Sequence, residues 1–75
     1  MINYSNKGGD SGISAYKIDV DGIIIQFNTG AKYLYTNSSA GTSNIEKMKK
    51  LAVSGEGLNS FIMRHVRTSY SAKLS

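Results

Sequence analysis

Hydrophobic and polar residues alternate along the first half of the chain, between residues 13 and 35, with the two-residue period of β-strands. The segment from Ile23 to Phe27 is rich in β-branched and aromatic side chains, and turn-forming residues flank it on both sides. This arrangement is typical of a central strand between two neighbours. The pattern therefore predicts a three-stranded antiparallel meander.

Two turns determine the register expected within this meander. Asp21-Gly22 favours a two-residue type I′ turn, because both residues tolerate a positive φ, and Val20 would then pair with Ile23. The segment Asn28-Thr29-Gly30 predicts a three-residue loop with its glycine left-handed. This loop would place both tyrosines of Tyr33-Leu34-Tyr35 on the same face of the sheet as the central strand's core residues.

One face of the predicted sheet is apolar and is expected to be covered by helices. Its residues are Tyr16, Ile18, Val20, Ile23, Ile25, Phe27, Tyr33 and Tyr35. The opposite face is largely polar, but Ile24 and Leu34 should lie side by side on it. This pair is expected either to be lightly covered by the N-terminal tail or a helix, or to form an interaction patch.

Two helices are predicted after a Ser/Asn/Gly-rich linker over residues 36–42. The segment from Ser43 to Glu46 has the form of a capping box, and Gly55 supplies the stop of the first helix. A second helix is predicted from about Leu58 to Thr68. The helix residues expected in the core are Ile45, Met48, Leu51, Ala52, Leu58, Phe61, Ile62 and Val66. Because helices and sheet must bury their apolar surfaces together, the sequence predicts an α+β fold with the element order β-β-β-α-α and both helices on one face.

The composition fits one small domain. The chain has 75 residues and no cysteine, so neither disulfides nor thiol chemistry are available to it. No signal peptide and no apolar run long enough to span a membrane are visible, and we expect a cytoplasmic protein without membrane contact. We expect residues 1–11 to form a flexible tail, residues 12–70 the domain, and residues 71–75 a frayed end. A roomy active-site cleft is not expected in so short a chain.

No set of residues suited to catalysis or metal binding stands out. His65 is the only histidine, and its position between apolar residues of the second helix favours a place at the boundary of the core. The carboxylates are scattered, so no cluster of metal ligands is expected. No nucleophile has a matching acid and base. We therefore expect a protein that is not an enzyme and holds neither a cofactor nor a metal.

The basic residues are the candidates for a binding surface. The formal net charge of +4 suits a polyanion, although it also suits ordinary solubility. Two arginines lie one turn apart on the polar side of the second helix, and arginine can bind phosphate through two parallel hydrogen bonds. The residues predicted to contact nucleic acid are Arg64, Arg67, Lys47, Lys50 and Lys73. A solvated helix face is the alternative interpretation.

Tyr33 and Tyr35 suggest a second kind of contact, because aromatic side chains on a sheet can stack on the bases of RNA. The predicted register, however, turns both rings toward the helices. We therefore expect both tyrosines in the core, with their hydroxyl groups at its rim.

Several short motifs follow one another in a distinctive order. A strand ending in Phe27 is followed by Gly30 and Tyr33-Leu34-Tyr35, and later by the segments 57–62, 66–67 and Tyr70. From about residue 13 to residue 70, this order resembles the KTSC domain. That short domain is named for its occurrence at the C-terminus of some lysyl-tRNA synthetases, and it also occurs as free-standing small bacterial and phage proteins.

The resemblance implies a set of motif positions that are structural rather than catalytic. In this chain they are Tyr33, Tyr35, Gly57, Asn59, Phe61, Val66 and Tyr70. Residues 37–40 stand where many members have Val-Pro, which leaves the start of the first helix open. RNA binding has been suggested for the family because of its attachment to synthetases, which is an association rather than a physical reason.

Two functions follow as hypotheses. The first is a non-enzymatic module that binds nucleic acid, more specifically RNA, through phosphate contacts of the basic residues. The second is a protein-interaction or self-association module that uses Ile24 and Leu34 or a free edge of the sheet.

Overall fold

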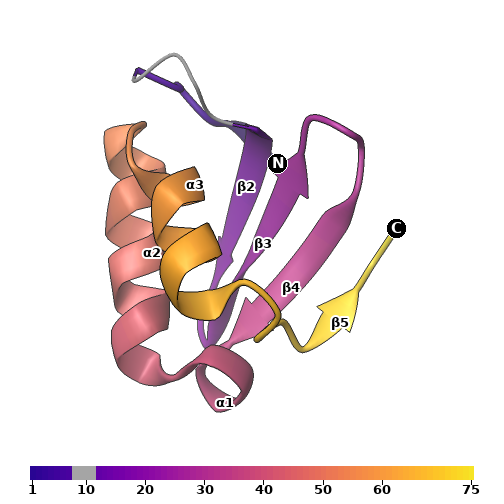
Figure 1. The fold of residues 1–75 in the computed structure, drawn as a ribbon, viewed down its shortest axis with the longest axis vertical. Coiled ribbons are helices and arrows are strands. Elements are labelled where there is room, and N and C mark those ends of the chain that lie inside the picture. The colour runs from indigo at the N-terminus through magenta and orange to yellow at the C-terminus, as the bar shows by residue number, and fades with distance from the viewer. Residues whose placement is uncertain (8–11) are drawn as a thin grey trace.

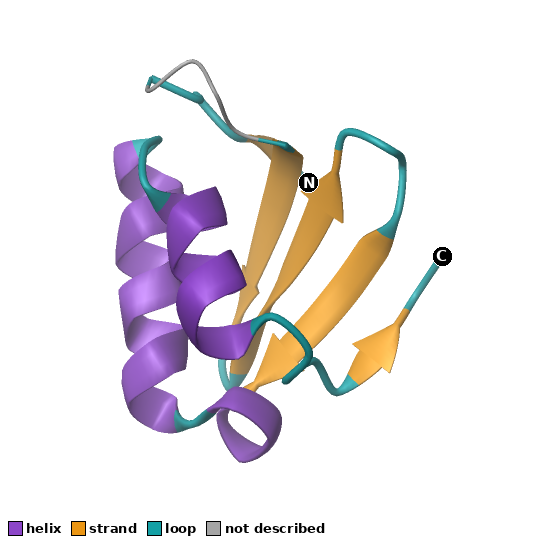
Figure 2. Ribbon diagram, in the orientation of Figure 1, coloured by secondary structure: helices purple, strands orange, loops and turns teal. Residues whose placement is uncertain are grey.

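A five-stranded antiparallel sheet carries the helices on one of its faces in the computed structural model, which describes residues 1–7 and 12–75 (Figures 1 and 2). The strands lie in chain order: β1 (Ile2–Asn3), β2 (Ile13–Asp19), β3 (Gly22–Phe27), β4 (Lys32–Thr36) and β5 (Ala72–Lys73). Between β4 and β5 come α1 (Asn37–Ala40), α2 (Thr42–Ser54), α3 (Leu58–Phe61) and the π-helix η1 (Ile62–Val66). The predicted α+β class is confirmed, with two strands and one short helix more than predicted.

The pairing of β3 with β4 has the predicted register. Ile23 lies opposite Tyr35, and Ile25 lies opposite Tyr33. The loop between the strands closes with the Phe27 N–H donating to the Ala31 carbonyl at 2.9 Å, and its glycine has the expected positive φ of 92°. This three-residue loop therefore places both tyrosines on the face of the sheet that the helices cover.

The predicted register of β2 against β3 is wrong by two residues. Ile18 pairs with Ile23, so the turn consists of Val20 and Asp21, and Gly22 belongs to β3. Gly22 is not required for a positive φ: a side chain there would collide with the backbone carbonyl of Tyr35 on β4. The glycine thus permits a close approach of two strands rather than a type I′ turn.

This shift removes two residues from the predicted core. A slip of two residues leaves every side chain on its original face, so Tyr16 remains in the core. Val20, however, moves into the turn, where it is 97% exposed, and Ile18 beside the turn is 39% exposed.

The N-terminal segment was predicted to be a flexible tail, but residues 1–7 are built into the fold. Ile2 pairs with Tyr16, so that β1 covers the edge of β2. Tyr4 is buried, and its hydroxyl accepts a hydrogen bond of 3.3 Å from the Leu58 N–H at the start of α3. Because the buried ring and its hydroxyl anchor this segment, the tail prediction is wrong for residues 1–7. Its remainder, residues 8–11, lies outside the described residues.

The C-terminal residues 71–75 were predicted to fray, but they form the opposite edge of the sheet. Tyr33 pairs with Lys73 and Leu34 with Ala72. The Ser71 N–H donates to the Leu34 carbonyl at 2.6 Å, and further hydrogen bonds join residues 74 and 75 to β4. Both edges of the predicted three-stranded meander are therefore paired with the chain's own terminal segments.

The helix boundaries are partly as predicted. Gly55 ends α2 with a φ of 84°, and its N–H donates to the Leu51 carbonyl. The capping box, however, is formed by Thr36 and Ser39 and opens α1, where a linker was predicted. Thr36 ends β4 in an extended conformation, which an N-cap residue requires, whereas α2 begins after Gly41 without a side-chain cap.

The core lies between the helices and the concave side of the sheet. From α2 it receives Ile45, Met48 and Ala52, and from the second helical segment Leu58, Ile62 and Val66. The sheet contributes Ile13, Tyr16, Ile23, Ile25 and Tyr35. Leu51 and Phe61, predicted to be buried, are only half-buried at its margin.

The close approach at Gly22 gives a first prediction. We expect Gly22→Ala to lower the free energy of unfolding by about 1–3 kcal/mol, because the added methyl group must displace the backbone of β4. Gly12→Ala is the matched control, since a methyl group there meets nothing within 4 Å. Urea unfolding followed by circular dichroism measures both. Equal stability of the two variants would contradict this role of Gly22.

A second prediction concerns the N-terminal segment. Tyr4→Ala should lower the free energy of unfolding by about 3 kcal/mol, because it leaves a cavity and an unpaired Leu58 N–H. Ile2→Ala, in the same segment but 57% exposed, should change it by less than about 1 kcal/mol. Thermal or urea unfolding distinguishes the two variants. If Tyr4→Ala were as stable as Ile2→Ala, the segment would not be anchored as described.

Candidate functional site

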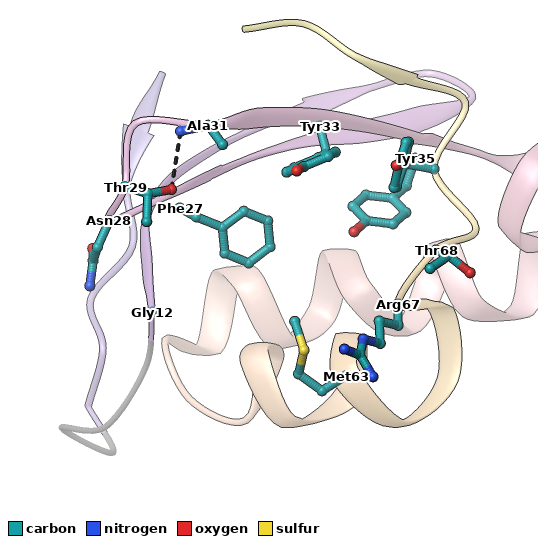
Figure 3. A pocket seen from close by; sticks show the side chains of 11 residues that line it. Gly12, Phe27, Asn28, Thr29, Ala31, Tyr33, Tyr35, Met63, Arg67 and Thr68 are labelled. Atoms are coloured by element: carbon teal, nitrogen blue, oxygen red, sulfur yellow. Dashed lines mark hydrogen bonds between the residues drawn. The ribbon is translucent and has the colours of Figure 1, made fainter.

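A cleft of about 480 Å³ opens between the β3–β4 end of the sheet and the last helical turn (Figure 3). The sheet and its adjoining loops contribute Gly12, Phe27, Asn28, Thr29, Ala31, Tyr33 and Tyr35. The helical side contributes Met63, Arg67, Thr68 and Tyr70. A cleft of this size was not expected from the length of the chain. It exists because η1 does not extend over the outer end of β3 and β4.

Aromatic rings form much of the wall of this cleft. The rings of Phe27 and Tyr33 meet edge to face with centroids 5.7 Å apart. Tyr70 packs against Tyr33 at 4.7 Å and, edge to face, against Tyr35 at 6.2 Å. The rings thus form one continuous cluster that extends from the core to the surface.

The two tyrosines of the predicted motif lie in different surroundings. Tyr35 is 1% exposed, as predicted for a core residue. Tyr33, also predicted to be core, is only half-buried and lines the cleft. Since η1 ends at Val66, the ring that covers Tyr33 comes from Tyr70 instead of a helix, and it leaves part of Tyr33 accessible.

Burial raises the pKa of the Tyr35 hydroxyl from 10.0 to about 12. The neighbouring phenol groups of Tyr33 and Tyr70 add to this shift, because their negative charges would repel a phenolate at Tyr35. Tyr35 therefore stays neutral at any physiological pH, and its part in the site is to support the other rings.

The segment formed by η1 and the residue that follows it brings two side chains to the cleft, while two others enter the core. Ile62 and Val66 are buried, whereas Met63 and Arg67 both line the cleft. Figure 3 shows Met63 extending from the helical side toward the rings of the sheet, whereas the Arg67 side chain runs along the helical side. Single π-helical turns are often found at functional sites, and this one shapes one wall of the cleft.

Of the five cations predicted to contact nucleic acid, one lines the cleft and a second lies beside one of its rings. Arg67 is part of its wall and is exposed. Lys73 on β5 pairs with Tyr33, and its ammonium group lies 5.9 Å from the centre of the Tyr33 ring. The two side chains thus approach the aromatic cluster from the helix side and from the edge strand.

The other three predicted cations lie elsewhere. Arg64 is exposed on η1 but does not line the cleft. Lys47 and Lys50 are exposed on α2, and the helical period places them opposite the buried face of that helix. The five residues therefore do not form one continuous surface around the cleft.

No acidic side chain lines the cleft among the residues that the structure describes. Asp19 and Asp21 lie at the β2–β3 turn, and Glu56 follows α2. Glu46 forms an ion pair of 3.6 Å with Lys49 on α2. Arg67 and Lys73 therefore give the cleft a positive potential that no lining carboxylate offsets.

Four further positions of the predicted motif lie in α3 and η1 or directly before them. Gly57 has a φ of 84° and its carbonyl accepts a hydrogen bond from the Phe61 N–H, so it begins α3 in a left-handed conformation. Val66 is buried, and Asn59 is half-buried. The ring of Phe61 lies 4.6 Å from that of His65, which is exposed rather than at the boundary of the core.

Sequence reasoning did not identify Phe27, Met63 and Thr68 as site residues. Phe27 was assigned to the core, and the other two were not singled out. The four-residue spacing of Met63 and Arg67 was the only available signal, because on an ordinary helix it already indicates a shared face. The cleft itself depends on where η1 ends, which the sequence pattern did not indicate.

Over residues 1–7 and 12–75, no group of three or more potential metal ligands lies close together. None of the helices described is both long and apolar enough to cross a membrane.

No protein-family model matches the sequence, and neither a curated protein nor a solved structure shows significant similarity to it. The resemblance to the KTSC domain therefore stays a prediction.

The raised pKa of Tyr35 gives a third prediction. Between pH 10.0 and about 12 the unfolded chain loses the Tyr35 proton while the folded chain keeps it. The wild type should therefore lose stability relative to Tyr35→Phe by about 1.4 kcal/mol per pH unit in this range. Below pH 10.0 the difference between the two proteins should be constant. Urea unfolding of both proteins across this range measures it, and a pH-independent difference would contradict the shift.

Proposed function

We propose that the chain is a small non-enzymatic module that binds nucleic acid at the aromatic cleft. The single observation that carries this proposal is the presence of Arg67 and Lys73 beside accessible aromatic rings, with no acidic residue in the lining. Phosphate groups would contact the two cations, and bases would contact the rings. This combination of a positive groove with stacking surfaces is typical of modules that bind single strands with weak sequence preference.

Because the proposed binding site is the cleft, the set of residues proposed to contact nucleic acid differs from the set predicted from the sequence. Arg67 and Lys73 remain among the proposed contacts, and Tyr33 joins them as a proposed stacking surface because it is only partly buried and lines the cleft. Arg64 lies on the same helical turn as Arg67. It would add to the positive electrostatic potential but would not contact a ligand in the cleft. The remote pair Lys47 and Lys50 would contribute only long-range attraction, which salt screens.

A protein-interaction function is the second candidate, and one observation favours it. The helices leave the far face of the sheet uncovered (Figure 1), and Ile24 pairs with Leu34 on that face, with Ala72 next to them on β5. All three side chains are half-buried. The other route, pairing through an edge of the sheet, has less free edge available, because β1 pairs with residues 15–16 of β2 and β5 pairs with residues 33–34 of β4.

Charge reversal tests the nucleic-acid proposal with a matched control. We expect Arg67→Glu combined with Lys73→Glu to weaken binding of a labelled single-stranded RNA at least about tenfold. The slope of log affinity against log salt concentration should fall by the amount that corresponds to about two phosphate contacts. Lys47→Glu combined with Lys50→Glu changes the net charge by the same amount but should leave the salt dependence unchanged. Fluorescence anisotropy at two salt concentrations measures both quantities.

Two results would contradict the proposal. The first is an equal loss of affinity in both double variants, which would indicate a general effect of net charge. The second is the absence of salt-dependent binding in the wild type together with a concentration-dependent dimer in sedimentation experiments. That second result would support the protein-interaction function instead.

A further inference from the structure

The cleft has a size suited to one planar ring rather than to a double helix. Its volume of about 480 Å³ lies within the range of roughly 300–1,000 Å³ that is usual for small-ligand sites. A base in a duplex can enter such a site only after it has been unpaired and unstacked, which costs a few kcal/mol. A single strand presents its bases without that cost.

Two facing walls of the cleft suit the flat face of a nucleobase. Phe27 and Tyr33 extend from the sheet, and Met63 extends toward them from the helical side (Figure 3). Met63 is 47% exposed and lines the cleft. Aromatic rings and thioethers are polarizable and make favourable contacts with a π system placed between them.

The rim of the cleft adds polar groups that a purely apolar ligand would not use. Thr29 accepts a hydrogen bond of 3.4 Å from the Ala31 N–H, which holds its hydroxyl at the rim beside the rings. Thr68 contributes a second hydroxyl group on the helical side. Arg67 belongs to the same wall as Met63, and its exposed side chain runs along the helical side of the cleft. A guanidinium group that turned toward the bound ring could donate two parallel hydrogen bonds to the phosphate attached to it.

From this arrangement we propose that the cleft binds one unpaired nucleobase of a single strand between Phe27 and Met63, with the adjoining phosphate on Arg67. This inference rests on the proposed function and specifies its ligand. Lys73 contacts a further phosphate from the β5 side, since its ammonium group already lies next to the ring of Tyr33. The absence of acidic residues from the described lining favours this anionic ligand over a basic peptide.

Three probes of equal length, about eight nucleotides, separate base binding from phosphate binding. They are a single strand, the same strand with abasic sites, and a duplex of the same sequence. We expect the intact single strand to bind about tenfold or more tightly than either of the others at one salt concentration, as stacking of one base implies. Equal affinities for the intact and abasic strands would overturn the inference and leave the proposed function in place. No binding of any of the three would refute both.

A variant pair tests the position of the base. Met63→Ala should weaken binding of the intact strand about fivefold to tenfold and leave binding of the abasic strand unchanged. Val53→Ala on α2 is the control, because Val53 is 67% exposed and lies outside the cleft lining. Neither residue is part of the buried core, since Met63 is 47% and Val53 is 67% exposed, so neither variant should unfold. A loss in Met63→Ala that is equal for intact and abasic strands would overturn the assignment.

Two further ligands test the class of molecule. In NMR spectra the methyl group of Met63 should shift on addition of the single strand, because a stacked ring changes its magnetic environment, while the methyl groups of Val53 should not shift. A free nucleoside monophosphate that binds as tightly as the strand would overturn the single-strand assignment in favour of a free nucleotide. Tighter binding of a peptide with an apolar C-terminal residue would overturn it in favour of a protein ligand.

Discussion

The pairing of β3 with β4 is the contact on which the remaining structure depends. Gly22 lets the two strands approach closely at one end, and the loop after Phe27 closes the other end. This register places Tyr35 beneath the helices and Tyr33 two residues nearer the end of the sheet, where η1 has already ended. One alternating segment therefore supplies both a core residue and a wall of the cleft.

The two terminal segments complete this arrangement in a similar way. Each adds a two-residue strand to an edge of the sheet and brings one tyrosine to the helical side. Tyr4 connects the N-terminal segment to the start of α3, whereas Tyr70 packs on Tyr33 and Tyr35. Short edge strands also protect a sheet from pairing with other chains. The cleft thus depends in part on the C-terminal segment, because Tyr70 forms the part of its wall that packs on Tyr33 and Tyr35.

Elements could be predicted from the sequence where the local conformational preference of the residues agrees with the pattern of burial. The central strand, the loop at Gly30 and the end of α2 at Gly55 follow from turn chemistry and periodicity, and each has the predicted place. The turn at Asp21-Gly22 was misassigned because the glycine permits a close contact with the backbone of Tyr35 on the neighbouring strand. That partner strand is distant in sequence and leaves no signal at the turn itself.

The terminal strands could not be predicted for a related reason. Two-residue segments are too short to show an alternating pattern, and their stability comes from an existing edge and from a single anchoring tyrosine. The same limit applies to the site. Sequence reasoning selected Arg67 and Lys73 by their charge but grouped them with Lys47 and Lys50, which lie on the outer face of α2. Because the effect of a charge depends on its position, the proposed coupling of a phosphate contact to a stacked base requires cations beside the accessible rings, where Arg67 and Lys73 lie.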